Sequence, residues 1–440
     1  MTILNNLGFW NKTTNFVRQH VIDLMFMLSI FLFRIPPFYV IINNNPLFLT
    51  YNIGRALSIL IIFQKIVTNR NSISRAISVN KHVFFFLLLF FLSQSIPIIK
   101  AINIVEYLKK YKDFIFFIII FIDSYLLSNR KTMILYIYTL LIASLVSLGI
   151  QVIMYHFTYI FKAIKINIEQ NYYQFFEFQK NRGRFFGETF DEVITPLIFV
   201  IYRKGWASIF FYSLLILITY TTYISNWRTK TIMFIFAVIF TGIFIYFKKS
   251  VKLLTIGSVV VLIFTIAILA NVISINTTGT SVNQRLLLLD SESLNTTTVR
   301  LKYWNTAKEI GMSNFLLGVG LGNYFDYLSN KEKTMNSNQI GLSSNTKFII
   351  IDDPHNIFLS TFVSTGIIGL ISISILIFYF AYSDLLYFFN NKKDGLAYLL
   401  SISNWTLFLF SLFNPFLYWQ YLYFFALLRG SLEKIKYLKK

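Results

Sequence analysis

Long apolar runs separated by short polar segments dominate the pattern of this chain. A helix needs about 20 mostly apolar residues to cross a bilayer. The runs that approach or reach this length are 21–41, 46–67, 82–99, 114–128, 132–155, 190–202, 206–224, 231–247, 253–274, 356–383, 396–413 and 415–428. Lipid offers no partner to an unpaired backbone amide, so each run should be helical, and none alternates like a barrel strand. The pattern predicts an all-α polytopic membrane protein with about 12 transmembrane helices.

Composition supports the same class. Of 440 residues, 56% are hydrophobic and only 13% are charged, whereas soluble domains carry about a quarter. The chain contains no cysteine and four histidines, which excludes disulfides, thiolate nucleophiles and Cys-held metals. A net charge of +21 would suggest nucleic acid in a soluble domain. In a membrane protein this excess gathers in cytoplasmic loops, so we expect membrane lipids as partners and no nucleic acid.

Lysine and arginine favour an N-terminus in the cytoplasm, although the short loop at 100–113 then carries four lysines outside. The chain would divide into residues 1–274, with nine spans and an external loop at 156–189, a large external loop at 275–355, and three spans in 356–440. The first apolar run is long and no small-residue cleavage site follows it, so we expect no cleaved signal peptide.

The large loop ends at a histidine that is a candidate for chemistry. His355 follows Asp353 and Pro354 and precedes Asn356 at the start of an apolar run. Pro354 restrains the turn, so the imidazole should be held at the membrane–water boundary. A histidine there is a candidate general base. The alternative is an interfacial histidine bonded to a backbone carbonyl.

Four arginines in the external segments are candidates for ligand binding. Arg228 lies in a very short outer loop, where the positive-inside rule disfavours it. Arg182 and Arg184 are near the end of the 156–189 loop, and Arg300 begins a stretch with helical spacing. A planar guanidinium binds phosphate oxygens in pairs, so arginines beside lipid favour a phosphate or pyrophosphate headgroup. Solvated loop charge is the alternative for each of them.

Two further arginines, Arg34 and Arg55, fall inside apolar runs. A charge within a span is by default a functional hypothesis. We expect Arg34 to extend its side chain toward the outer surface. We expect Arg55 either to line a polar cavity or to pair with an intramembrane acid such as Asp123.

A glycine-rich stretch, Gly318–Asn323 (GVGLGN), looks like a nucleotide loop. It lacks the Rossmann fingerprint, because Asn323 takes the third glycine position and no βαβ unit surrounds it. The apolar run around it, 314–328, should lie on the membrane surface. The adjacent acids Asp352 and Asp353 are weak evidence for a divalent-ion site.

Several of these motifs together resemble the O-antigen ligase and O-antigen polymerase superfamily. They are R-x3-W-x2-A from Arg300, N-F-L-L-G-V-G-L-G-N-Y from Asn314, D-P-H-N-I-F-L from Asp353 and G-I-I-G-L from Gly366. The stretches at 181–187 and 227–229 resemble two further arginine motifs of the family. Trp227 stands where the ligases often have serine, a departure that bears on the choice between ligase and polymerase.

The resemblance implies a membrane glycosyltransferase of the GT-C type, without cofactor or metal, that inverts the anomeric carbon. Such an enzyme moves a glycan from undecaprenyl pyrophosphate to the hydroxyl of an acceptor glycolipid or glycan, in surface-polysaccharide and lipopolysaccharide biosynthesis. It would be a multi-pass protein of the bacterial inner membrane with its active site facing the periplasm.

Carried over by position, the pyrophosphate would bind to Arg228, Arg300 and Arg184, and His355 would be the base. Supporting roles would fall to Trp304, Asn356, Arg182 and Arg55. Two alternatives stay open. A polymerase that joins lipid-linked repeat units shares the same residues. A transporter of lipid-linked oligosaccharides would favour broken helices in paired halves, and the sequence shows no such pairing.

Overall fold

The structure is a computed structural model. It describes residues 20–34, 39–42, 45–156, 191–201, 206–224, 228–247, 304–334, 354–391, 394–412 and 419–438. The predicted span at 253–274 and most of the two predicted external loops lie outside these residues.

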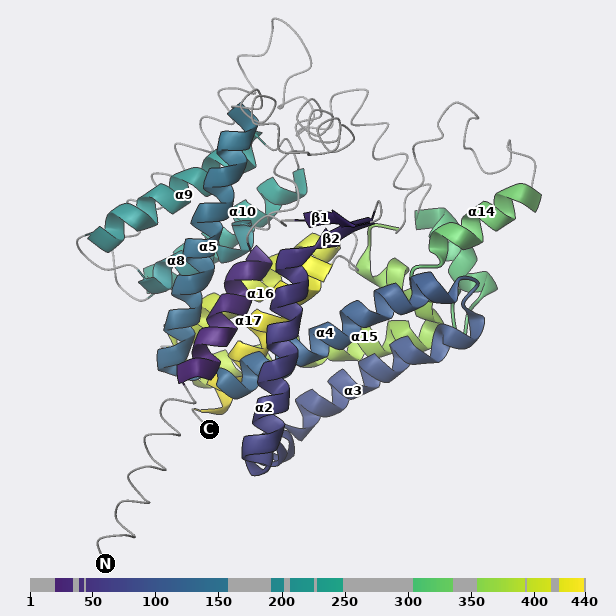
Figure 1. Ribbon diagram of the computed structural model, residues 1–440, viewed down its shortest axis with the longest axis horizontal. Coiled ribbons are helices and arrows are strands. Elements are labelled where there is room, and N and C mark those ends of the chain that lie inside the picture. Colours follow the sequence, from purple (N-terminus) through teal and green to yellow (C-terminus); the bar gives the residue numbers. More distant parts are fainter. Residues whose placement is uncertain are drawn as a thin grey trace, which may run out of the picture.

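Helices make up nearly all of the described chain (Figure 1). The labelled helices are α2 (Leu49–Val79), α3 (Lys81–Ser95), α4 (Ile104–Leu127), α5 (Arg130–His156), α8 (Asp191–Ile201), α9 (Trp206–Ile224), α10 (Arg228–Phe247), α14 (Tyr324–Thr334), α15 (Ile357–Asn390), α16 (Gly395–Ser411) and α17 (Trp419–Tyr437). Residues 20–34 and 304–313 are also helical, and a short 3-10 helix, η1 (Ile96–Lys100), follows α3. The helical prediction therefore holds for most of the described residues in the apolar runs.

Three of the described helices are long and apolar enough to cross a membrane: Lys81–Lys100, Arg130–Ile153 and Ile357–Asn390. Shorter apolar helices cover Tyr212–Thr222, Thr229–Ile243 and Gly395–Ser411. Together they indicate a multi-pass membrane protein. The number of twelve spans and the GT-C architecture stay predictions.

The first two predicted spans are wrong where they meet. Residues 39–41 and 46–48 were expected in helices, but Tyr39–Ile42 (β1) and Asn45–Phe48 (β2) form an antiparallel pair. In its register Tyr39 faces Phe48 and Ile42 faces Asn45. Pro36 and Pro37 explain the break, because proline cannot continue a helix interior. The asparagines at 43–45 favour a turn rather than a helix.

Other boundaries shift as well. The predicted external loop at 100–113 is mostly the first part of α4, which begins at Ile104. Asn103 caps this helix, because its side chain accepts a hydrogen bond from the Glu106 amide at 3.2 Å. Lys109, Lys110 and Lys112 are thus helical residues. The helix predicted for the apolar run 114–128 begins earlier, with a polar segment at its N-terminal end.

The helices pack into two groups around α16 and α17 (Figure 1). On one side α3 packs against α15, and α4 packs against α2 and α17. On the other side α8 packs against α5, α9, α10 and α16. One continuous core of buried apolar side chains runs through both groups. Many large apolar side chains on the outside of the helices are exposed, as expected for surfaces that face lipid.

A network of charged side chains joins α15, α16 and α17 near the end of the bundle where α15 stops. Asp384 accepts hydrogen bonds from both terminal nitrogens of Arg429, at 3.0 and 2.9 Å. Lys436 bonds Asp384 and Glu433, and Arg429 also bonds Glu433. Ser401 and Trp405 of α16 donate to Asp384 at 2.7 and 2.9 Å. We call this end of the molecule the Arg429 end, and the opposite end, where α15 begins, the His355 end.

Candidate functional site

His355 occupies an unusual backbone conformation directly before α15. Its φ is 58°, and it is the only non-glycine residue with positive φ in the described part of the chain. A non-glycine residue in this region costs about 1–3 kcal/mol, and such residues gather at functional sites. The side chain is half-buried. The conformation strengthens the case for His355 as a functional residue over an ordinary interfacial histidine.

Two of the predicted supporting residues hold the backbone on both sides of His355. The indole nitrogen of Trp304 donates a hydrogen bond to the Pro354 carbonyl at 3.0 Å. Asn356 caps α15, because its side-chain oxygen accepts bonds from the amides of residues 358 and 359. Its Nδ2 also donates to the Leu412 carbonyl at the end of α16, at 3.1 Å. Residues about 50 positions apart in the chain therefore fix the turn that carries the imidazole.

The glycine-rich stretch has a structural role here. We call residues 314–323 the glycine loop. The Val319 amide donates to the Val363 carbonyl at 2.8 Å, and the Gly320 amide donates to Ser364 at 3.0 Å. In return the Ile367 amide donates to the Phe315 carbonyl at 2.7 Å. The loop is paired, backbone to backbone, with the N-terminal third of α15, so these amides are not available to cradle a phosphate.

The pairing is possible because α15 is broken at Gly366, where φ is 66° and ψ is −162°. Gly318 faces the break with a φ of 67°. A Cβ added at Gly318 would collide with the Val363 carbonyl, and one added at Gly366 would collide with the backbone of Leu316. Glycine is thus required at both positions by conformation and by close approach.

Asn323 explains why this motif ends in asparagine. Its side chain is fully buried. Its oxygen accepts a bond from the Asn103 amide at 2.5 Å, and its nitrogen donates to the carbonyls of Asn103 and Leu321 at 3.2 and 2.9 Å. Asn323 therefore attaches the glycine loop to the N-terminal end of α4. No motif in the sequence predicts this contact, which joins residues 220 positions apart.

Two buried ion pairs lie at the start of α8. Asp191 pairs with Arg34, at the end of the helix over 20–34, and Arg34 Nε donates to Ser144 of α5 at 2.8 Å. Glu192 pairs with Lys230 of α10 at 3.3 Å. Both carboxylates are completely buried. The prediction that Arg34 reaches the outer surface is wrong, because its side chain is 5% exposed and is held by an acid inside the bundle.

Glu192 binds both arms of the α9–α10 hairpin through one atom. Its Oε1 accepts a hydrogen bond from Thr222 Oγ1, in the last turn of α9, at 2.9 Å. The Lys230 ammonium, in the first turn of α10, lies 3.3 Å from the same oxygen. Among the residues described, the other oxygen of Glu192 has no hydrogen-bond partner. Three residues of the chain separate the end of α9 from Arg228, the first residue of α10.

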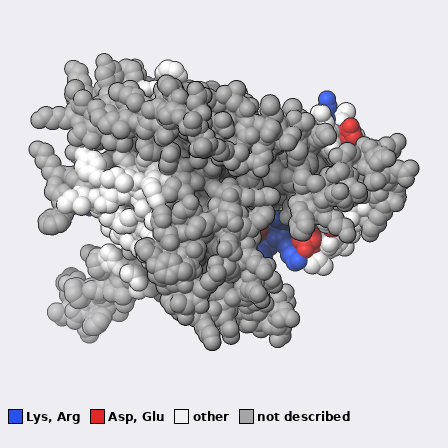
Figure 2. Space-filling view, turned by 90° about the horizontal axis from the view of Figure 1, so that it is seen from above, with Lys and Arg blue, Asp and Glu red and all other residues white. Residues whose placement is uncertain are grey.

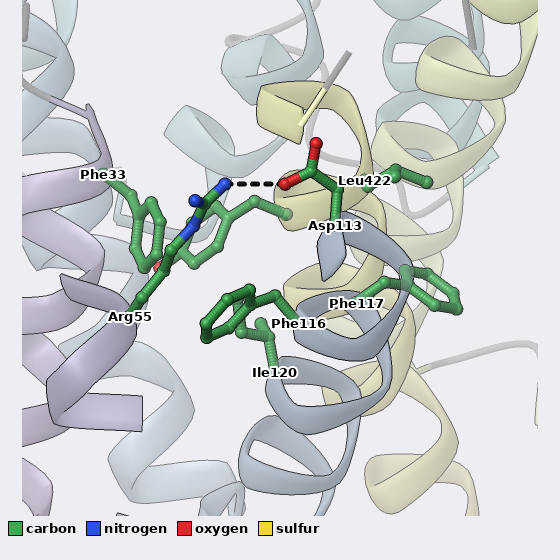
Figure 3. Close-up of a pocket in the computed structure, with 8 residues that line it drawn as sticks. Phe33, Arg55, Asp113, Phe116, Phe117, Ile120 and Leu422 are labelled. Atoms are coloured by element: carbon green, nitrogen blue, oxygen red, sulfur yellow. Dashed lines mark hydrogen bonds and ion pairs between the residues drawn. The ribbon is translucent and has the colours of Figure 1, made fainter. Parts of the chain in front are cut away.

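Arg55 lines a small pocket between α2, α4 and α17 (Figure 3). Its guanidinium pairs with Asp113 at 2.8 Å and lies 4.8 Å from the centre of the Phe116 ring. The remaining lining residues are Phe33, Phe117, Ile120, Leu422 and Tyr423. The cavity volume is about 10 Å³, roughly the space that one water molecule needs. The cavity is thus too small for a sugar or a pyrophosphate.

The suggested partner of Arg55 was wrong in one respect. Asp113, rather than Asp123, pairs with it, because α2 and α4 pack together with Arg55 facing the N-terminal half of α4. Burial raises the pKa of the Asp113 carboxyl above its ordinary value, while Arg55, Lys112 and Lys110 lower it to a smaller extent. This ion pair has a structural explanation, so a role for Arg55 in substrate binding stays a prediction.

The predicted pyrophosphate site is described only in part. Arg182, Arg184 and Arg300 lie outside the described residues, as do Asp352 and Asp353. Arg228 begins α10, but its side chain is also outside them. Within the described part of the chain, no cluster of His, Asp or Glu is arranged to hold a metal ion. The convergence of these arginines on His355 therefore stays a prediction.

The surface at this end carries charge of both signs. Figure 2, seen from above the view of Figure 1, shows two small groups of charged side chains among the described residues, each with basic and acidic members. Among the described residues, Lys109 and Glu106 in the first turns of α4 form an exposed ion pair, 2.5 Å apart. The described part of this face is thus not uniformly cationic.

Sequence reasoning missed Asp191, Glu192 and Lys230. One signal was present: two adjacent acids stand at the start of an apolar run, where carboxylates favour a helix N-terminus. Their partners could not be identified, because Arg34 lies 157 positions before Asp191 in the chain.

Comparison with known proteins gives one match. Residues 213–374 match the family model described as O-antigen ligase. The matched range begins in α9 and ends within α15, and it includes Arg228, Trp304, the glycine loop and His355. No curated protein matches the chain. The match confirms the resemblance noted in the sequence.

Proposed function

We propose that this protein transfers a glycan from undecaprenyl pyrophosphate to an acceptor hydroxyl. The premise is the match of residues 213–374 to the O-antigen ligase family. The reaction takes place at the periplasmic face of the bacterial inner membrane. The observation that carries the proposal is the turn at His355. A strained backbone, the Trp304 bond and the Asn356 cap together hold one imidazole at the start of an apolar helix.

The leaving group sets the first requirement of the reaction. When the bond between the anomeric carbon and the phosphate oxygen breaks, undecaprenyl pyrophosphate leaves with additional negative charge. Preorganised guanidinium groups stabilise such charge in the transition state. Arg228, Arg300 and Arg184 are the groups that we assign to this task, with Arg182 in support. Because fixed positive charge serves here, the proposal requires no metal.

The acceptor sets the second requirement. Its hydroxyl oxygen attacks the anomeric carbon from the face opposite the leaving pyrophosphate, which inverts the configuration. The hydroxyl proton passes to the neutral imidazole of His355, as general base catalysis requires. The hydrogen bond from Trp304 to Pro354 supports this assignment, because Trp304 follows Arg300 by four residues in the chain and thus links an arginine motif to the base.

Purified full-length protein in detergent tests the proposal directly. It is incubated with an undecaprenyl-pyrophosphate-linked glycan and an acceptor glycolipid, and the products are separated by mass. Transfer onto the acceptor supports a ligase. Longer chains that remain on the lipid carrier would instead identify a polymerase. If the purified protein forms no new glycosidic bond with either acceptor, the enzyme assignment fails.

A deletion strain gives the same distinction in cells. Loss of a ligase leaves finished polymer on its lipid carrier, unattached to lipid A–core. Loss of a polymerase leaves single repeat units attached to the core. Complementation with wild-type protein must restore the full-length pattern, and complementation with the His355→Ala variant must not.

A further inference from the structure

We infer that the two buried ion pairs at the start of α8 position the donor-binding arginines. Arg34, Asp191, Glu192 and Lys230 would be positioning residues that do not touch the substrate. We call them, with Thr222, the α8 clamp. This inference rests on the proposed function, since it assumes that Arg228 and Arg184 bind the pyrophosphate.

The first argument is the place of the clamp in the chain. Lys230 follows Arg228 by two residues, and Asp191 follows Arg184 by seven. The bond between Glu192 and Lys230 therefore joins the start of α8 to the start of α10, and each start lies close in the chain to a candidate arginine. The same oxygen of Glu192 binds Thr222 and Lys230. One side chain thus contacts both the end of α9 and the start of α10.

The second argument is that side chains of three other elements bond to the first turn of α8, and a fourth element, α5, holds one of those side chains. Arg34 comes from the helix over 20–34 and is itself bonded to Ser144 of α5. Thr222 and Lys230 belong to α9 and α10. Apolar contacts alone allow a helix to slide or rotate, whereas an ion pair is satisfied at only one register. The first turn of α8 is thus held in position from several sides.

The third argument is that the stability of the helix interface does not require buried ion pairs. Well-packed apolar side chains usually stabilise a buried interface as well as an ion pair does. The neighbouring contacts of α8 are already apolar, since Val193, Ile194, Leu197 and Ile198 are all buried. The charged residues of α8 are confined to Asp191 and Glu192, next to the predicted external loop at 156–189. We infer that they fix the orientation of the first turn of α8.

The test uses a double substitution that removes both charges while keeping bulk. In Glu192→Gln/Lys230→Met, glutamine can still accept the Thr222 bond and methionine replaces the lysine stem. We expect a folded protein whose Kd for undecaprenyl pyrophosphate, the probe ligand, and whose KM for the glycan donor rise at least tenfold. The kcat should change much less. A double variant that binds and transfers like the wild type would overturn the inference.

A control variant neutralises another ion pair between helices, in which the carboxylate is buried and the arginine is partly exposed. Arg130 pairs with Asp394, which caps α16, at 2.5 Å. The Arg130→Gln/Asp394→Asn variant should keep the wild-type Kd and KM. A similar rise in both double variants would show a general packing effect and would overturn the positioning role. If the first double variant does not fold, Thr222→Val removes only the hydroxyl bond, and Lys230→Arg keeps the charge. The former should raise KM, and the latter should keep it near the wild-type value.

A spectroscopic measurement separates this inference from the proposed function. The chain has no cysteine, so a single spin label can be attached at Asn226→Cys without background. The label, between α9 and α10, should become more mobile in the Glu192→Gln/Lys230→Met background than in the wild-type background. If the label becomes more mobile in the double variant but the wild-type protein neither binds nor transfers the donor, the clamp is supported and the proposed function is refuted. An unchanged spectrum would refute the clamp even in an active enzyme.

Discussion

The two ends of the bundle both bury charge, but they do so in different ways. At the Arg429 end, Asp384 receives bonds from a guanidinium, an ammonium, a hydroxyl and an indole, all on α16 and α17. The helices concerned follow one another in the chain. Two carboxylates balance two cations in this network, and among the residues described Arg429 Nε is its one buried nitrogen without a hydrogen-bond partner. We interpret this network as a structural clasp.

The His355 end is assembled from distant segments and keeps features that stability alone would not select. Arg34 and Asp191 are far apart in sequence, and one oxygen of Glu192 lacks a hydrogen-bond partner among the residues described. His355 adopts a strained backbone conformation, and α15 is broken at Gly366. Burial of charge is therefore a poor guide to function, whereas strain and long-range assembly beside a matched family motif are better guides.

The largest contrast should come from the base itself. His355→Ala should lower the rate of glycan transfer by about 10²–10⁴-fold, the usual contribution of a general base. Protein level and membrane insertion should be unchanged. His355→Gly relieves the positive φ, so it should be as inactive but more stable than the alanine variant. Full activity in either variant, measured with purified protein, would remove His355 as the base.

At the opposite end, the expected loss is in stability. Asp384→Asn leaves two buried cations with too little compensation, which should lower the free energy of unfolding by about 3–5 kcal/mol. Thermal unfolding of the purified protein measures this, and the kcat of the folded fraction should not change. Glu106→Gln, at an exposed ion pair, is the control and should cost about 1 kcal/mol or less. A large fall in kcat for Asp384→Asn would contradict the division between the two ends.

Replacing an arginine of the predicted external loop by lysine tests whether bidentate phosphate binding is needed. Arg300→Lys keeps the charge but loses the fork that binds two phosphate oxygens. A charge-assisted hydrogen bond contributes about 1.5–3 kcal/mol, so kcat/KM for the donor should fall about 10–100-fold. Lys308→Arg, on the exposed side of the helix over 304–313, is the control and should be neutral. An Arg300→Lys enzyme with wild-type kcat/KM would exclude bidentate binding there.

A smaller effect is expected from the contact between the glycine loop and α15. Gly318→Ala forces a side chain into a left-handed residue that faces the Val363 carbonyl, at a cost of about 1–3 kcal/mol. Activity should fall because the loop follows the helix that carries Trp304. In α5, Gly149 has open space around its Cβ position, so Gly149→Ala should stabilise the protein by about 0.5–1 kcal/mol. Equal melting temperatures for the two variants would disprove the strained contact.

The smallest expected effect is none. If arginines alone stabilise the departing pyrophosphate, EDTA should not change the rate of transfer by the purified enzyme. Inhibition that is reversed by added divalent metal would contradict this. It would also make Asp352 and Asp353 the first residues to test as ligands.

Much of the helical pattern could be predicted from hydropathy, because a span must be apolar on all sides and long enough for the bilayer. The start of α4 and the hairpin of β1 and β2 could not be predicted in this way. Both depend on local signals, the Asn103 cap and the prolines at 36–37, that a window of mean hydropathy averages out.

The candidate site was predictable to a lesser degree. His355, Trp304 and Asn356 could be named from motifs, and the structure joins them in one turn. The role of the glycine loop could not, because a positive φ and a close backbone approach have the same sequence signature in a nucleotide loop and in a docking loop. The pairing of Arg34 with Asp191 depends on which helices become neighbours, and that information is not local.

The break in α15 has a mechanical consequence. The glycine loop bonds to α15 before the break, at Val363 and Ser364, and after it, at Ile367. Residues 368–390 make up the long remainder of the helix. Thickening, thinning or tilting of the surrounding lipid would act on the remainder. The backbone bonds around Gly366 would resist that motion before it reached the imidazole. We therefore expect the position of the His355 imidazole to depend little on the lipid composition of the bilayer.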